Sequence, residues 1–284
     1  MKRRTALGWA ACLVTQSGRA ARAAEPTRLR IGLTAVILAD QVAFLTRWGK
    51  YLSVRTDCSV SFVARESYQG VLDLLFSSQL EAAWICGYPY VQNQARLQLL
   101  PMPLYQGKPL YQAYLIRPRG AKEGIDAWAD LKDRVLAYSD PLSNSGWLVP
   151  QAQLREAGLG PRDLRRGFFA HGHRNVCEAV AARLAQAGCI DGYVWETMRR
   201  QKMSVVEQTE VIWKSSEYGF PPLVARHGAP TEVIQRLRAA LLGMSADAEG
   251  RALLDSLNLD GFRDEPSQRF DSIAALAAAQ SRVG

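Results

Sequence analysis

The chain of 284 residues lacks the long apolar runs of membrane proteins and the motifs of the common cofactor-dependent enzymes. No stretch approaches the roughly 20 apolar residues needed to cross a bilayer. There is no Walker A loop, GxGxxG, GxSxG or HExxH. With three histidines and no CxxC pair, the sequence also offers no obvious zinc-site spacing. We therefore expect a protein without a metal or cofactor, and not an enzyme.

Acidic residues are absent from the first 24 residues, which differ in this from the rest of the chain. Basic residues open this segment, an apolar stretch follows at 6–14, and small residues end it at 20–24, as in a secretory signal peptide. We expect residues 1–24 to be cleaved and the protein to be exported to the periplasm. Without the five basic residues of this segment the formal net charge falls from +8 to +3. So small a surplus argues against nucleic-acid binding.

Cysteines are few, and four remain after the expected cleavage: Cys58, Cys86, Cys177 and Cys189. An even number in an oxidising compartment permits disulfides, and three complete pairings exist, among which the sequence does not choose. A bridge between Cys177 and Cys189 is disfavoured, because a helix of about ten residues would hold them roughly 15 Å apart.

Predicted strands and helices alternate over most of the chain, which is typical of a mostly parallel sheet covered by helices. The first series has the order strand, helix, strand, helix, strand, at residues 30–33, 40–52, 60–63, 69–77 and 82–86. The last of these strands runs into a predicted Gly-Tyr-Pro-Tyr turn. Two stretches rich in Ala and Leu, 231–257 and 267–279, are predicted to be helical.

A second series begins near residue 125, with strands at 135–138 and 190–194 and helices from Gly146 and Asn175. Two β-rich runs, 110–116 and 211–225, could carry the chain between the two series. This pattern predicts an α/β fold of two lobes joined by two hinge strands, with a ligand cleft between them. We place one lobe at 25–113 and 215–284 and the other at 114–214. The loops that follow the strands should face the cleft.

The most informative stretch is residues 139–150, Ser-Asp-Pro-Leu-Ser-Asn-Ser-Gly-Trp-Leu-Val-Pro, which joins a predicted strand to a helix. Ser and Asn at a helix start cap free backbone N–H groups. The same N–H groups and the helix dipole also attract anions. A simple N-cap and an anion site are both consistent with this stretch.

A second stretch, 168–175, contains His171, His173 and Arg174 before another predicted helix. A His or Arg beside an anion site can donate charge-assisted hydrogen bonds. The alternatives are a solvated loop with a capping histidine, or a metal pair that lacks an obvious third ligand.

Together these stretches resemble the periplasmic phosphate/phosphite/phosphonate-binding family of ABC transport proteins. The first stretch is similar to its Asp-Pro-x-Ser-Thr-Ser-Gly-x-x-Val-Pro signature. The resemblance extends to 67–71, 87–91, the Phe-Phe…Gly-His loop, 190–193 and 221–224. It implies a type II periplasmic binding fold that captures a small oxyanion and delivers it to a transporter permease, and a monomer.

The resemblance also implies a set of ligand-binding residues. Around the oxyanion we expect Tyr68, Ser143, Asn144, Ser145 and His173. Tyr88 or Tyr90 would supply a wall, and Glu196 stands where aminophosphonate binders place a carboxylate for the ligand amine. The sequence departs from the family at Asn144, which replaces the usual Thr. It also departs at Phe220-Pro221, where an acidic residue would complete an amine site, which puts an aminoalkyl phosphonate in doubt.

Cys86 ends a predicted strand where the cleft should lie, and it allows three interpretations. The ordinary one is a small buried core residue. Cys86 could instead bind a thiophilic species, as in family members that resemble arsenite sensors and signal to a membrane histidine kinase. A third hypothesis makes Cys86 a nucleophile with His173 as base, but no third orienting residue is evident. The sequence does not identify the oxyanion.

Overall fold

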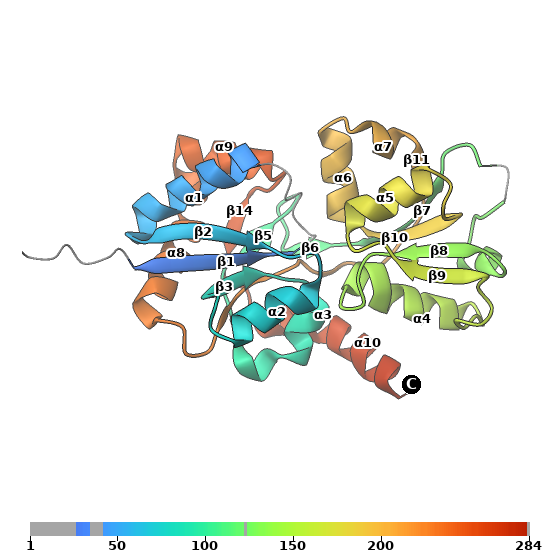
Figure 1. Cartoon of the computed structure of the whole chain (residues 1–284), viewed down its shortest axis with the longest axis horizontal. Helices are drawn as coiled ribbons and strands as arrows, with labels where there is room; N and C mark the ends of the chain where they lie inside the picture. The colour runs from blue at the N-terminus through green and yellow to red at the C-terminus, as the bar shows by residue number, and fades with distance from the viewer. Residues whose placement is uncertain (1–26, 35–41, 122–123, 283–284) are drawn as a thin grey trace, which may run out of the picture.

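The computed structural model describes residues 27–34, 42–121 and 124–282, so the expected signal peptide lies outside the described residues. The chain forms two five-stranded sheets, each flanked by helices (Figure 1). In the first sheet the order is β2-β1-β3-β13-β4: β2 Ser59–Ala64, β1 Arg28–Leu33, β3 Ala82–Trp84, β13 Leu223–Arg226 and β4 Leu97–Leu99. β1 is parallel to β2 and β3, whereas β13 is antiparallel to β3 and β4.

The second sheet has the order β11-β7-β10-β8-β9: β11 Thr209–Lys214, β7 Ala113–Pro118, β10 Ala187–Asp191, β8 Val135–Tyr138 and β9 Arg166–Phe169. β8, β9 and β10 are parallel, and β7 is antiparallel to β10 and β11. The carboxyl ends of the parallel strands therefore meet at one edge of this sheet.

Helices cover both sheets because their apolar residues recur at helical spacing. In α1 (Val42–Thr56), Phe44, Trp48, Tyr51 and Leu52 are buried against the first sheet and its neighbouring helices. The other helices near this sheet are α2 Tyr68–Phe76, α3 Gly87–Gln92, α8 Thr231–Leu242 and α9 Ala248–Ser256. Those near the second sheet are α4 Val149–Glu156, α5 His173–Ala181, α6 Gly192–Arg200 and α7 Ser204–Glu207.

Two short strands lie between the two sheets (Figure 1). β6 (Leu110–Tyr111) pairs antiparallel with β12 (Tyr218–Gly219). β6 is followed by β7 and β12 is preceded by β11, so both short strands connect to the second sheet. A separate two-stranded sheet pairs β5 (Met102–Leu104) with β14 (Gly261–Arg263). The architecture is thus a two-lobed α/β fold with a pair of linking strands.

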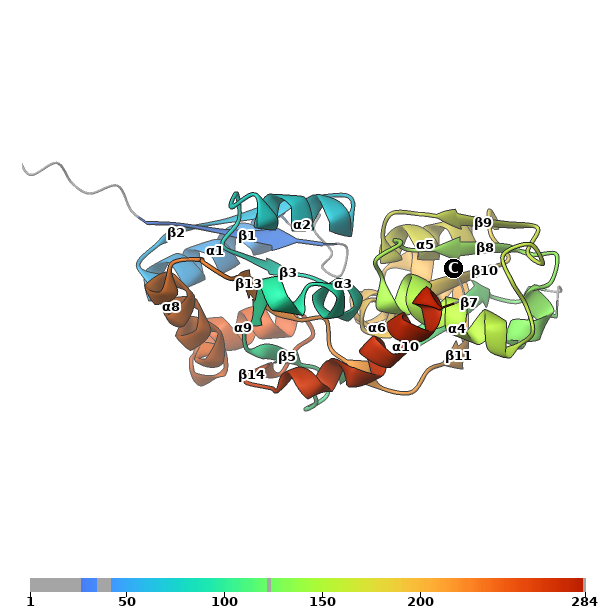
Figure 2. The same ribbon diagram turned by 90° about the horizontal axis from the view of Figure 1, so that it is seen from below.

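The C-terminal helix α10 (Asp271–Ser281) packs on α3 beside the first sheet and on α4 beside the second (Figure 2). The approach to α3 is close, since a Cβ on Gly87 would lie 2.6 Å from Ile273 Cδ1. At the other end of α10, Arg155 of α4 donates a hydrogen bond to Gln280. This helix therefore bridges the two lobes on one side of the molecule.

Three local predictions were wrong. The strand expected to reach residue 194 ends at Asp191, because Asp191 caps the helix α6 that begins at Gly192. The Gly-Tyr-Pro-Tyr segment is the start of α3 and not a turn, and Pro89 is tolerated there because the first helical turn needs no N–H donor. The predicted helical region 231–257 is divided at Gly243 into α8 and α9. No helix among the described residues is long and apolar enough to span a bilayer.

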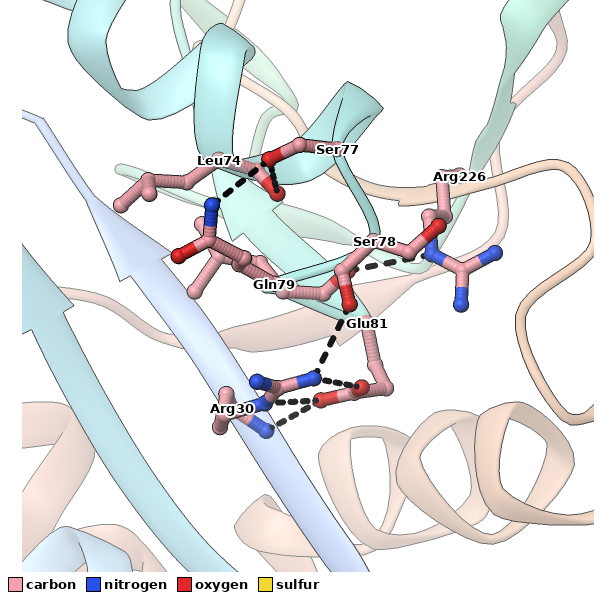
Figure 3. Close-up of polar contacts among 8 residues, drawn as sticks. Arg30, Leu74, Ser77, Ser78, Gln79, Glu81 and Arg226 are labelled. Carbon is pink, nitrogen blue, oxygen red and sulfur yellow. Dashed lines mark hydrogen bonds and ion pairs between the residues drawn. The ribbon is translucent and has the colours of Figure 1, made fainter.

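Glu81, the residue before β3, forms an ion pair with Arg30 of β1 and so links these two neighbouring strands of the first sheet (Figure 3). Arg30 Nη2 lies 2.8 Å from Glu81 Oε1, and the backbone N–H of Arg30 donates to Glu81 Oε2 at 2.7 Å. Arg30 also donates to the carbonyl of Ser78, and Arg226 donates to that of Leu80. Both oxygens of this buried carboxylate are therefore satisfied.

Candidate functional site

Segments from both lobes meet where strands end at their carboxyl edges, the expected position of a ligand site in α/β sheets. From the second sheet come the segments that follow β8, β9 and β10. From the first lobe come the start of α2 after β2, and Cys86 directly after β3. The linking strand β6 adds Tyr111. The buried side chains of this cluster are Tyr68, Cys86, Tyr111, Ser139, Asp140, Ser143, Asn144, Ser145, His173 and Asp191.

The segment after β8 forms a tight, glycine-dependent helix start. Ser143 caps a π-helical turn (Asn144–Leu148) that continues into α4, and its Oγ accepts the N–H of Gly146 at 2.9 Å. A Cβ on Gly146 would lie 1.8 Å from Ser139 Oγ and 2.7 Å from Ser139 Cβ. Only glycine therefore fits, and the close packing fixes Ser143, Asn144 and Ser145 at the helix start.

Asn144 joins the two lobes. Its backbone N–H donates to Cys86 Sγ at 3.2 Å, and its side-chain Nδ2 donates to the Tyr111 hydroxyl at 3.0 Å. Burial raises the pKa of Tyr111 well above its usual value, and the hydrogen bond with Asn144 opposes this rise. Tyr111 was not predicted, because it stands in a β-rich run that indicated only a lobe crossing.

His173 begins α5 and is a neutral hydrogen-bond donor. Its Nδ1 accepts the backbone N–H of Asp191 at 3.1 Å, so its proton lies on Nε2, which is 3.2 Å from the Tyr68 hydroxyl. Burial lowers the pKa of His173 to about 3. The expectation of a charge-assisted bond from this residue was therefore wrong, because desolvation disfavours the imidazolium.

Tyr68 is the first residue of α2 and also bridges the lobes. Its backbone N–H donates to Asp140 Oδ2 at 3.2 Å, and its hydroxyl bonds His173 Nε2 at 3.2 Å. Burial raises the pKa of Tyr68 well above its usual value, so the hydroxyl keeps its proton. Asp140 could have been found from its place in the Ser-Asp-Pro stretch, since a carboxylate suits the start of a helix.

Asp191 lies at the end of β10 and was not predicted. Its Oδ1 accepts the backbone N–H of Val194 at 3.2 Å, and its Oδ2 has no hydrogen-bond partner. Burial raises the pKa of Asp191 to about 7. Among the described residues, half of the buried side-chain atoms without a partner lie in this cluster: Ser139 Oγ, Asn144 Oδ1, Ser145 Oγ and Asp191 Oδ2. Buried polar groups normally have partners, so these atoms indicate a polar ligand.

Three of the predicted residues have other neighbours. Tyr90 packs its ring on Phe270, with centroids 4.8 Å apart, and Tyr88 is only partly buried. Glu196 accepts hydrogen bonds from the Tyr114 hydroxyl and from Arg199. Its neighbour Tyr114 lines a cavity of about 90 Å³ whose wall also includes Tyr105, Tyr111, Gln112, Gly192 and Tyr193. Glu196 thus lies beside this cavity with its carboxylate already bonded.

The cluster does not have the electrostatics of a cysteine–histidine catalytic pair. Burial raises the pKa of Cys86 to about 11, which keeps the thiol protonated, and His173 is a weak base with both ring nitrogens engaged. The described residues contain no group of three or more His, Cys, Asp or Glu side chains that could hold a metal ion. The site gathers buried hydrogen-bond donors and acceptors from two lobes, which suits ligand capture.

Fold and site together define a two-lobed solute-binding protein. A profile described as the periplasmic substrate-binding protein of phosphonate ABC transporters matches residues 32–267, and the chain belongs to this family. It is a family of substrate-binding transport proteins and not of enzymes.

Similarity to individual proteins agrees with this assignment. The chain is 27% identical to the phosphate-import protein PhnD of Mycolicibacterium smegmatis over 206 residues, which cover 66% of this chain and 63% of that protein. It is 23% identical to the phosphonates-binding periplasmic protein of Escherichia coli, covering 85% and 72%.

Among solved structures, a binding protein of a Pseudomonas aeruginosa phosphonate transporter superposes with a TM-score of 0.83 and 21% identity, covering 91% of this chain and 88% of that one. PhnD1 of Prochlorococcus marinus, in complex with methylphosphonate, gives a TM-score of 0.79 at 18% identity, covering 90% and 99%. These two structures share the fold of the chain.

Proposed function

We propose that this protein captures a small oxyanion of the phosphate/phosphite/phosphonate class in the periplasm and delivers it to an ABC transporter permease. The observation that carries the proposal is the group of buried polar atoms without partners at the helix start that contains Asn144 and Ser145. Backbone N–H groups and hydroxyls at such a position bind anionic oxygens. The family assignment supports the same class of ligand.

Closure of the two lobes completes the site. Three hydrogen bonds link the lobes directly at the cluster: Tyr68 to His173, Tyr68 to Asp140, and Asn144 to Cys86. Each needs both lobes in place, so an open arrangement about β6 and β12 would separate these groups and admit the ligand. A permease would then distinguish the closed, loaded protein from the open one.

The surroundings favour an oxyanion without a positively charged substituent. Arg199 already neutralises Glu196, with Nη2 2.7 Å from Oε2, and Phe220 is a fully buried apolar residue. An ammonium group would meet an aromatic wall and a carboxylate that has a partner, and burying a charge without a free counter-ion is costly. We infer that phosphate, phosphite or a simple alkylphosphonate binds more tightly than an aminoalkyl phosphonate.

Calorimetric titration with phosphate, phosphite, methylphosphonate and 2-aminoethylphosphonate tests this function. We expect binding of at least one of the first three, weakened about tenfold by Ser145→Ala, because an unmade charge-assisted bond costs on the order of 1.5 kcal/mol. The control is Ser61→Ala, since Ser61 is exposed on β2. Failure to bind any of these anions, or an equal effect of both substitutions, would contradict the proposal.

A second function, an arsenite sensor that signals to a membrane histidine kinase, is favoured by one contact. Cys86 Sγ lies at the helix start where the anion is proposed to bind, 3.2 Å from the backbone nitrogen of Asn144. Arsenite could bond to this thiol, with the displaced hydroxyl leaving as water with the thiol proton. Arsenite binding that is lost in Cys86→Ala would support the sensor, whereas methylphosphonate binding that survives Cys86→Ala would support the transport function.

A further inference from the structure

The carboxylate of Asp191 is held at the site by contacts that do not use its second oxygen. Its backbone N–H is bonded to His173 Nδ1, its Oδ1 caps α6, and the next residue, Gly192, donates its N–H to Gln112 at the linking strands. A Cβ on Gly192 would lie 2.8 Å from the Gln112 carbonyl oxygen. These contacts fix Asp191 between α5, α6 and the hinge, and Oδ2 remains without a partner.

Within the part of the chain that the structure describes, no charged group balances this carboxylate. Asp191 raises the pKa of the ionisable groups around it, which shows that its charge reaches across the cluster: Tyr68, Cys86, Tyr105, Tyr111, Tyr114 and Tyr193. Those groups keep their protons at neutral pH, and the adjoining His173 is neutral. The described residues that stabilise ionised Asp191 are the backbone N–H groups of Val194 and Tyr193.

A buried carboxyl group and an anionic ligand oxygen must share one proton, because two anionic oxygens without a proton between them repel each other. Burial raises the pKa of Asp191 to about 7, so above this pH the carboxyl is ionised and the ligand has to bring the proton. Asn144 Oδ1 is a second buried acceptor without a partner in the same cluster. A ligand with only bare oxygens would satisfy the donors of the site and leave both acceptors unpaired. A ligand with a P–OH group supplies the missing donor.

We propose that Asp191 is a specificity-determining residue that accepts a hydrogen bond from a protonated oxygen of the bound anion. The proposal rests on the function proposed above and narrows its ligand class to anions that carry a proton in the site. The monoanions of phosphonates and of phosphite each keep one P–OH, and the phosphate monoanion keeps two. A sulfonate has the same shape and three oxygens, but none of them carries a proton, so above pH 7 it binds only if Asp191 first takes up a proton.

Methylphosphonate and methanesulfonate form a matched pair of ligands for this test. At pH 8 we expect the purified protein to bind methylphosphonate at least about tenfold more tightly, because a sulfonate then requires proton uptake by a carboxyl whose pKa is about 7. Asp191→Asn places an N–H donor near the position of Oδ2 and keeps the helix cap. In this variant the ratio of the two affinities should fall at least about tenfold.

The controls separate this inference from the proposed function. Asp247→Asn changes another helix-capping aspartate, which accepts from Gly250 on α9, and should leave the ratio unchanged. Asp191→Ser also keeps a capping side chain and should lower the ratio if the Asn variant does not fold. If the unaltered protein binds methylphosphonate but Asp191→Asn or Asp191→Ser keeps the full ratio, Asp191 does not determine specificity. If the unaltered protein does not bind methylphosphonate or the related anions, the proposed function itself fails.

Discussion

Two buried carboxylates, one just before a strand and one at the end of another strand, differ in their hydrogen-bond partners. Glu81 precedes β3, and both of its oxygens accept hydrogen bonds from Arg30 (Figure 3). Asp191 ends β10, is completely buried, and has one oxygen bonded to the start of α6 and one without a partner. The first arrangement holds two strands together. The second leaves an acceptor available to a ligand, at a cost in stability.

The same contrast holds for the surroundings of each group. Near Glu81 the polar contacts are between protein atoms, including those of Ser78, Leu80 and Arg226. Near Asp191, hydroxyl, amide and carboxylate atoms are buried without partners. A protein tolerates such atoms where a ligand supplies their hydrogen-bond partners, which supports the proposal that the ligand binds at the strand ends of the second lobe.

The largest effect is expected for the pH dependence of stability in Asp191→Asn. The pKa of Asp191 is about 7 in the folded protein and about 3.9 in an unfolded chain. Between these values the unfolded state binds fewer protons, so Asp191 makes the folded protein less stable as the pH rises. As the pH is raised from 4 to 8, the free energy of unfolding of Asp191→Asn, measured with urea, should increase by on the order of 4 kcal/mol relative to that of the unaltered protein. An equal pH dependence in both proteins would show that Asp191 is not a desolvated, unpaired carboxyl.

Next in size is the effect of Gly146→Ala on binding. The added methyl group would overlap Ser139 and displace the helix start that carries Asn144 and Ser145. We expect the affinity for the oxyanion to fall at least about 100-fold, because small displacements of binding groups have effects of this size. Gly49→Ala is the control: its Cβ would meet no atom nearer than 3.6 Å, so binding should not change. Normal binding by Gly146→Ala would exclude this helix start from the site.

Glu81→Ala tests the other side of the comparison. Removing this carboxylate leaves the backbone N–H and the half-exposed guanidinium of Arg30 without their partner. The free energy of unfolding should fall by about 2 kcal/mol, less than for a fully buried pair, because water still reaches Arg30. Calorimetry on the same sample should give an unchanged oxyanion affinity. A loss of affinity without a loss of stability would remove the distinction between the two carboxylates.

The smallest effect is expected for Tyr68→Phe. The change removes a hydroxyl that bonds His173 Nε2, and keeps the ring and the backbone bond to Asp140. One neutral hydrogen bond contributes about 1 kcal/mol, so the affinity should fall about fivefold. Leu75→Met, a conservative change in the buried face of the same helix, should leave the affinity unaltered. No difference between the two variants would show that the hydroxyl takes no part in closing the site.

The sequence predicted the two-lobed fold and the helix start at Ser143–Ser145 because both depend on local patterns. Alternating strands and helices indicate a parallel sheet, and capping residues after a strand indicate a helix start near the ligand edge. The end of β10 was misplaced because Ile190-Asp191-Gly192-Tyr193 continues an apolar run that only the Asp191 cap interrupts.

The remaining site residues depend on tertiary contacts that no local pattern contains. Tyr111 is indistinguishable in sequence from other aromatic strand residues until β6 is placed beside Asn144. His173 was predicted near the site, but its charge was not, since its neutrality follows from complete burial. That Asp191 Oδ2 has no hydrogen-bond partner can be recognised only when the partners of every neighbouring group are known.

The most direct test of the central claim is a crystal structure of the protein with methylphosphonate. We predict that the phosphonate lies between the lobes, with its oxygens bonded to Ser145 Oγ and to backbone N–H groups of the π-helical turn Asn144–Leu148. One phosphonate oxygen should lie within about 2.7 Å of Asp191 Oδ2, as expected when a proton is shared with an ionised acceptor. A phosphonate bound elsewhere, or one whose oxygens all turn away from Asp191, would contradict the account.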